Sequence, residues 1–128
     1  GGDVVIDESC FTFDWGWIRD YDEGNCSLDV VIPSIINGQN VVYIDINVFQ
    51  YNNITSISIP DGVTYIGSSA FRYNQLTSVS IPDSVTFIDN GAFAENPLTS
   101  VSINSNTSYQ SNSFGYSCTE ANGCITLR

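Results

Sequence analysis

Residues 76–88 read LTSVSIPDSVTFI, and this stretch decides the fold because the chain repeats it. The pattern precedes it as ITSISIPDGVTYI at residues 54–66 and starts again as LTSVSI at residues 98–103, a step of 22 residues. Three further columns share this step: Ile44, Ile66 and Ile88; Phe49, Phe71 and Phe93; Asn52, Asn74 and Asn96. Self-similarity at such a period predicts a solenoid of stacked coils.

Each repeat carries the periodicity of one short strand. Val79 and Ile81 alternate with serines, and Pro82 ends the strand because it cannot donate to a ladder. The spacing of apolar residues over 85–93 favours a tight turn and a short helical or 3₁₀ segment. The asparagine column precedes the strands, and its amides are predicted to satisfy backbone groups of their own and the adjacent coil.

The repeats begin and end at recognisable residues. The first starts at Leu28 and contains a five-residue insertion around residues 37–38, which separates its Ile-Pro pair from the next by 27 residues. Polar residues then replace core positions at Thr107 and Gln110, as expected where a solenoid ends. We predict a single domain over 1–128, with a cap at 3–27, repeats at 28–104, and a degenerate last repeat with a second cap at 105–128.

The four cysteines form two local pairs, Cys10 with Cys26 and Cys118 with Cys124. Four cysteines allow three connectivities, and pairing within each terminal segment is the economical one. The rival is a zinc site, but the chain lacks the C-x2-C or Cys/His spacing that such a site needs. Two disulfides, one in each cap, would place the protein outside the cytosol.

Composition excludes several kinds of function. The chain has 14 acidic residues, three arginines and neither Lys nor His, for a net charge of −11. This balance argues against nucleic acid and anionic membrane surfaces, and no apolar stretch is long enough to insert into a membrane. We expect a monomer, which such a charge favours.

We also expect no enzyme, no cofactor and no metal. Nucleophilic catalysis has no His or Lys as its base, and the paired carboxylates recur beside turns, where turn formation explains them. The acidic residues of the first cap match no calcium-loop spacing. The carboxylates considered are Asp61, Asp83, Asp89 and Glu95 in the repeats and Asp20, Asp22 and Glu23 in the cap.

The repeated 76–88 motif, the Ala-Phe pairs at 70–71 and 92–93, and the segment VVIPSIING at 30–38 resemble the bacterial BspA-like leucine-rich-repeat family. The resemblance covers residues 28 to about 115, and the terminal cysteine segments look like caps found with such repeats. It implies short parallel strands on a concave side, turns with short 3₁₀ or helical segments on a convex side, and no catalytic residues. It also implies an extracellular or bacterial cell-surface protein used in adhesion or recognition.

Three surfaces compete as binding sites. The first is a face of serines that alternation turns away from the core, which would form a polar ligand-binding face or simply permit close strand stacking. The second is an aromatic column, which would be a binding platform or a structural ladder. The third is a pair of tryptophans that would anchor an interface or cover the open end of the first coil. Their residues are Ser56, Ser58, Ser78, Ser80, Ser100 and Ser102; Tyr43, Tyr65 and Phe87, with Tyr109 in the same register; and Trp15 with Trp17.

The sequence therefore predicts a secreted or cell-surface module that binds a host protein or glycan through a face of the solenoid. Two alternatives stay open at this point. Regular Ser and Thr columns would also suit an ice- or surface-binding solenoid, and the repeats could form a structural spacer.

Overall fold

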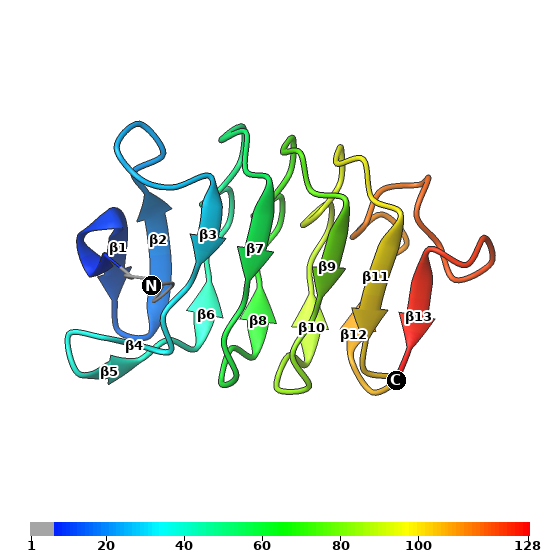
Figure 1. Ribbon diagram of the computed structural model, residues 1–128. Coiled ribbons are helices and arrows are strands. Elements are labelled where there is room, and N and C mark those ends of the chain that lie inside the picture. Colours follow the sequence, from blue (N-terminus) through cyan, green and yellow to red (C-terminus); the bar gives the residue numbers. More distant parts are fainter. Residues whose placement is uncertain (1–6) are drawn as a thin grey trace, which may run out of the picture.

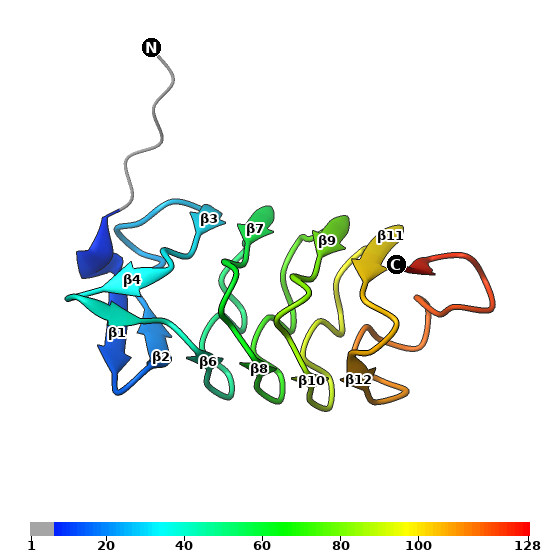
Figure 2. The same ribbon diagram turned by 90° about the horizontal axis from the view of Figure 1, so that it is seen from below.

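The computed structural model describes residues 7–128, which form a β-solenoid of about five coils (Figure 1). Two rows of strands run along opposite sides of the coils (Figure 2). One row, named here the serine face, has one strand from each coil: β3 (Asp29–Val31), β7 (Ser56–Ser58), β9 (Ser78–Ser80), β11 (Ser100–Ile103) and β13 (Ile125–Leu127). The opposite row is a six-stranded sheet, named here the long sheet.

The long sheet starts with an antiparallel hairpin and continues as parallel two-residue strands. Its members are β1 (Phe11–Asp14), β2 (Trp17–Tyr21), β6 (Tyr43–Ile44), β8 (Tyr65–Ile66), β10 (Phe87–Ile88) and β12 (Ser108–Tyr109). The short helical segments expected in the repeats are instead turns and these strands; within residues 7–128 the one 3₁₀ helix is η1 (Glu8–Cys10). Left-handed backbone explains the difference, because φ near +60° recurs inside these segments at Asn47, Ser69 and Gly91 and cannot continue a right-handed helix.

The serine face is split into two sheets. β7 pairs only with β3, whereas β9 pairs with β11 and β11 with β13, all in parallel register. Figure 1 shows the wider space that results between β7 and β9. β13 lies in the segment predicted as a degenerate last repeat and second cap, and its Ile125 pairs with Val101 at a step of 24 residues, which accommodates the second disulfide loop.

The inserted segment of the first repeat forms a hairpin of its own. β4 (Ile35–Ile36) pairs antiparallel with β5 (Gln39–Asn40) across Asn37 and Gly38, whose φ angles are 52° and 76°. A two-residue Asn-Gly turn with both φ positive matches the twist of a hairpin. Of the N-terminal cap predicted over 3–27, residues 3–6 lie outside the described part of the chain.

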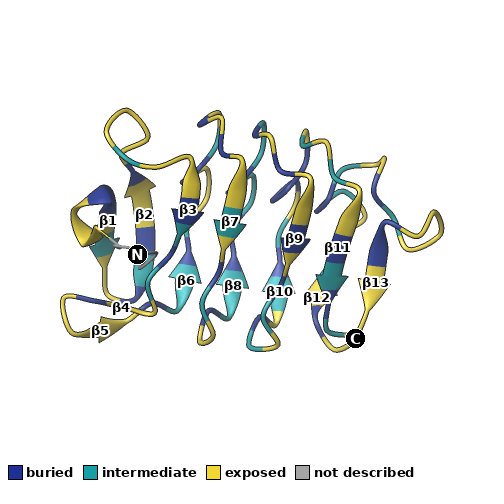
Figure 3. Ribbon diagram, in the orientation of Figure 1, coloured by how far each residue is buried: buried dark blue, intermediate teal, exposed yellow. Residues whose placement is uncertain are grey.

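The core consists of residue columns that run through successive coils, and every coil contributes buried residues (Figure 3). The rings of Phe49, Phe71 and Phe93 are fully buried and stack with centroid distances of 4.8 and 4.9 Å. At the N-terminal end, Tyr21 lies 5.2 Å from Phe49 and Phe11 lies against Tyr21. These two residues cover the phenylalanine end of the first coil, while Trp17 packs on Tyr43 of the same coil and Trp15 is exposed.

The asparagine column binds neighbouring coils together, as predicted. The side chain of Asn74 accepts from the backbone N–H groups of Asn52 and Ile54 at 3.1 and 3.0 Å. It donates to the carbonyl oxygens of Phe49 and Phe71 at 2.8 and 2.9 Å. One buried amide thus satisfies four backbone groups in two coils.

Both predicted disulfides are present, Cys10–Cys26 and Cys118–Cys124, near the two ends of the solenoid. Their partners are 16 and 6 residues apart in sequence, so opening them is expected to lower the free energy of unfolding by about 3 and about 2 kcal/mol. We would measure thermal unfolding with and without reductant. Two variants, each with both cysteines of one disulfide changed to serine, measure the two losses separately. An unchanged melting temperature on reduction would contradict this expectation.

Candidate recognition surfaces

The serine face presents hydroxyl groups to solvent along its whole length. Five of its six repeat serines are exposed, and Ser102 is half-buried. Within residues 7–128, four of the exposed hydroxyls have no hydrogen-bond partner in the protein, and the fifth, on Ser56, donates to Asp29. The four are Ser58, Ser78, Ser80 and Ser100. They are free to bond with a ligand.

Ser102 differs because the side chain of Arg128 lies over it. One guanidinium nitrogen of Arg128, Nη1, donates to Ser102 Oγ at 2.7 Å. The other, Nη2, donates to Asp83 Oδ1 at 2.7 Å and to the carbonyl oxygen of Ile81. Hydrogen bonds from Arg128 and then Asn104 lower the pKa of the Asp83 carboxyl.

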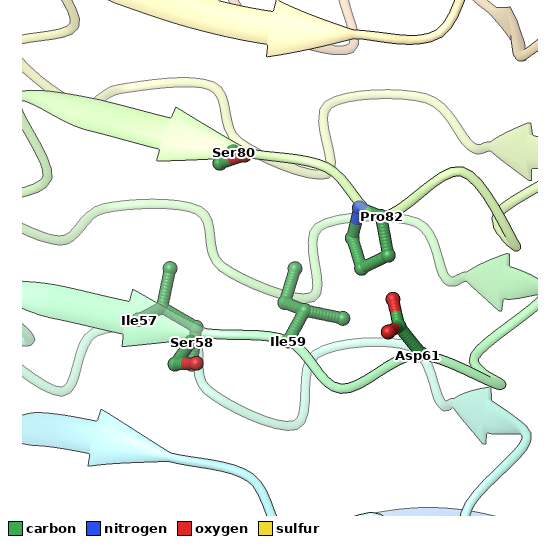
Figure 4. A pocket seen from close by; sticks show the side chains of 6 residues that line it. All are labelled: Ile57, Ser58, Ile59, Asp61, Ser80 and Pro82. Atoms are coloured by element: carbon green, nitrogen blue, oxygen red, sulfur yellow. The ribbon is translucent and has the colours of Figure 1, made fainter.

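A pocket of about 280 Å³ opens where β7 and β9 do not pair (Figure 4). In this figure Ile57 and Ile59 project into the space between the two coils, and the carboxylate of Asp61 points toward Pro82. Ile57 is half-buried, although its counterparts Val79 and Val101 are buried. The complete lining is Ile57, Ser58, Ile59, Asp61, Ser80 and Pro82. In the sequence repeat this position differs from its counterparts only in having Ile57 where they have valine.

The aromatic column lies on the long sheet and continues into the N-terminal cap. Trp17 is the strand partner of Tyr43, stacks on it at 4.5 Å, and meets Tyr65 edge-on at 5.9 Å. Tyr65 in turn stacks on Phe87 at 6.2 Å. The four rings are half-buried, and the stacked faces pack against one another, which supports the structural interpretation of this column.

Tyr109 does not extend the aromatic column. Phe87 pairs with Ser108, and Tyr109 pairs with Ile88, so the last strand is displaced by one residue from the 22-residue step. The Tyr109 ring packs edge-on against Phe114 at 5.6 Å. Its hydroxyl donates to Glu120, and burial together with this bond raises its pKa to about 12.

Titration of the Tyr65 hydroxyl tests how this residue is packed in the long sheet. Burial, and then the hydrogen bond from its hydroxyl to Asp89 at 2.7 Å, raise its pKa to about 12 from the usual 10.0. The folded protein holds this proton more tightly than the unfolded chain does, so the contribution to stability is present below pH 10 and is lost as the pH rises toward 12. In a spectrophotometric titration, Tyr65→Phe is expected to remove the amplitude of one phenol from the late phase. An unchanged late phase would contradict the assignment.

Two exposed aromatic sites lie elsewhere. Trp15 is 81% exposed at the tip of the β1–β2 hairpin, at a positive φ of 51°. The rings of Tyr51 and Tyr73 stack at 4.4 Å, with the Arg72 guanidinium 5.0 Å from the centre of the Tyr73 ring. Trp15 and Trp17 were predicted to form one candidate surface. In the structure the Trp15 indole is exposed, whereas the Trp17 indole packs on Tyr43.

Two of the acidic cap residues make local hydrogen bonds within the cap. Asp20 accepts from the backbone N–H of Tyr21, and Asp22 accepts from the Asn25 side chain. In the part of the chain that the structure describes, no group of three or more His, Cys, Asp or Glu residues is arranged to hold a metal ion. Nor does that part contain a helix long and apolar enough to span a membrane.

Comparison with known proteins identifies the repeat. The family model described as BspA type leucine rich repeat region matches residues 25–123 in six copies. Searches of curated proteins and of solved structures found no match. The matched region spans most of the chain and includes all the solenoid coils up to the second disulfide. The chain therefore belongs to the BspA-type leucine-rich-repeat family.

Proposed function

We propose that this protein is an extracellular recognition module that binds a protein partner through the serine face. The family is commonly surface- or adhesion-related, leucine-rich-repeat domains typically bind proteins, and two disulfides fit an extracellular location. The observation that carries the proposal is the exposed row of unpartnered serine hydroxyls, interrupted by the pocket between β7 and β9. Polar groups that are free in the protein can all be satisfied by an incoming chain.

The same geometry does not favour the other functions that the sequence left open. An ice- or mineral-binding face needs a uniform hydroxyl lattice, but the split between β7 and β9 and the Arg128 side chain over Ser102 interrupt this one. A sugar-binding platform needs free ring faces, whereas Trp17 and Tyr43 cover each other. A spacer would have no use for a pocket on its strand face.

A single substitution tests the proposed face. Ser78 is exposed on β9 at the centre of the serine face, so Ser78→Arg would place a bulky charge in the interface. We expect this variant to lose host-cell binding, and binding to a panel of purified extracellular matrix proteins, by about tenfold or more. Melting temperatures establish that both this variant and its control remain folded.

Asn90→Arg is the matched control, because it adds the same charge at an exposed residue beside the long sheet. It should bind as the wild type does. If Ser78→Arg binds normally and Trp15→Ser does not, the N-terminal hairpin rather than the serine face is the binding surface. Binding to a glycan array that Ser78→Arg abolishes would instead identify a glycan as the ligand of this face.

A further inference from the structure

We infer that the pocket between β7 and β9 is a binding site for the guanidinium group of an arginine side chain supplied by the protein partner. The inference rests on the proposed function and adds the chemistry by which the partner is recognised. It depends on a contact that the protein makes within itself, one coil further along the serine face.

Arg128 shows what the repeat can hold. Its guanidinium group is bound by three groups from two adjacent coils, which are the hydroxyl of Ser102, the carbonyl oxygen of Ile81 and the carboxylate of Asp83. A guanidinium has five donors in a rigid plane, so convergent oxygens of this kind select it well. The contact occupies the end of the β9 and β11 strands.

The pocket is the same arrangement moved back by one repeat. Ser80 is the strand partner of Ser102, and the 22-residue step relates Ile59 to Ile81 and Asp61 to Asp83. All three of these counterparts line the pocket (Figure 4). The carbonyl oxygen of Ser80 is an additional acceptor in the pocket, because its counterpart at the Arg128 site is already hydrogen-bonded. Ile81 donates its N–H to the carbonyl oxygen of Ser102, but within residues 7–128 no equivalent bond joins Ile59 to Ser80.

No residue of the described chain fills this copy of the site. The register puts Asn104 at the place from which Arg128 reaches back, since β11 pairs with both β9 and β13. Asn104 has a short neutral side chain, and its oxygen accepts from the N–H of Asn106. The remaining basic residues are engaged elsewhere, Arg19 with Asp45 and Arg72 beside Tyr73. The chain has no lysine, so a cation for Asp61 has to come from a partner.

The rest of the pocket suits an arginine side chain. Ile57, Ile59 and Pro82 offer apolar surface against which the methylene stem and the flat faces of the guanidinium can pack. The net charge of −11 attracts a basic partner to the surface and accelerates its association.

Titration of the whole protein with N-acetyl-arginine methylamide, followed by nitrogen–proton NMR, tests the inference. We expect saturable shifts of the backbone amides of Ser58, Asp61 and Ser80, and little response to the neutral citrulline analogue. Asp61→Asn should weaken binding by about tenfold or more, because a charge-assisted hydrogen bond is lost. Asp83→Asn, the same change one coil further along, should release Arg128 and leave binding at the pocket intact.

Three results would each overturn the inference: no saturable shift at these amides, equal binding of citrulline or of the lysine analogue, or unchanged affinity in Asp61→Asn. The probe titration and the cell-binding experiment test the guanidinium site and the proposed function separately. If the arginine probe does not bind but Ser78→Arg still abolishes cell binding, the proposed function stands and the guanidinium site falls. If the probe binds as expected but Ser78→Arg binds cells normally, the guanidinium site stands and the proposed function falls.

Discussion

Phe71→Ala is expected to lower the free energy of unfolding by about 4 kcal/mol, since removing a buried phenylalanine ring typically costs 3–5 kcal/mol. Phe71 is fully buried, and its ring is stacked between Phe49 and Phe93 at 4.8 and 4.9 Å. The cavity would lie between three coils that the backbone ladder of the long sheet holds at a fixed spacing, so the structure cannot collapse to fill it. Chemical denaturation monitored by far-ultraviolet circular dichroism measures the loss.

The control for this prediction is Tyr116→Ala. Tyr116 is 81% exposed and lies outside the stacked rings, so its loss should change the free energy of unfolding by no more than about 0.5 kcal/mol. A Phe71→Ala variant whose stability matches that of the control would show that the phenylalanine column does not carry the core.

Asn74→Ala is expected to cost about 3 kcal/mol or more. The Asn74 side chain is 1% exposed and makes four hydrogen bonds to backbone groups of two coils. Alanine would leave those groups buried without partners, and each buried unsatisfied group typically costs about 1–3 kcal/mol. Equilibrium unfolding measures the cost, and faster hydrogen exchange at the amides of Asn52 and Ile54 would locate it.

Two variants sharpen this test. Asn74→Asp keeps an acceptor oxygen but turns a carboxylate oxygen toward the carbonyl oxygens of Phe49 and Phe71, so this buried charge should make it at least as destabilising as Asn74→Ala at neutral pH. Asn90→Ala removes the amide of an exposed asparagine and should be nearly neutral. Equal stability of Asn74→Ala and Asn90→Ala would exclude the proposed role of the buried column.

Much of this fold follows from the sequence because each repeat obeys the same local rules. The alternation around Val79, the proline that ends the strand and the recurring Phe71 column specify the coil and its inward face. The repeating Asn74 position likewise predicted the bonds between coils, because a polar residue that recurs at a core position needs a recurring partner. The cysteine pairs were predictable because both partners lie in the same terminal segment.

The features that distinguish one part of the serine face and the long sheet from another could not be predicted from the sequence. The repeats at 54–66 and 76–88 are nearly identical, so a local pattern implies continuous pairing, yet the serine face is split there. Strand pairing depends on how whole coils are placed relative to one another, which a single repeat does not specify. The reach of Arg128 to Asp83 spans 45 residues of sequence, and Tyr109 is displaced by a one-residue shift that the periodic alignment hides. Such effects belong to the assembled solenoid and leave no signal in a single repeat.

The interrupted serine face has a mechanical consequence. Hydrogen bonds join every neighbouring pair of strands in the long sheet, but none of the strand ladders on the serine face crosses from β7 to β9. A pull along the solenoid axis therefore meets unequal resistance on the two sides of the coils. We expect the molecule to bend between β7 and β9, with the first two coils and the last three coils moving as units about the continuous long sheet. A partner that contacts both β7 and β9 would restrict this bending and stiffen the protein under load.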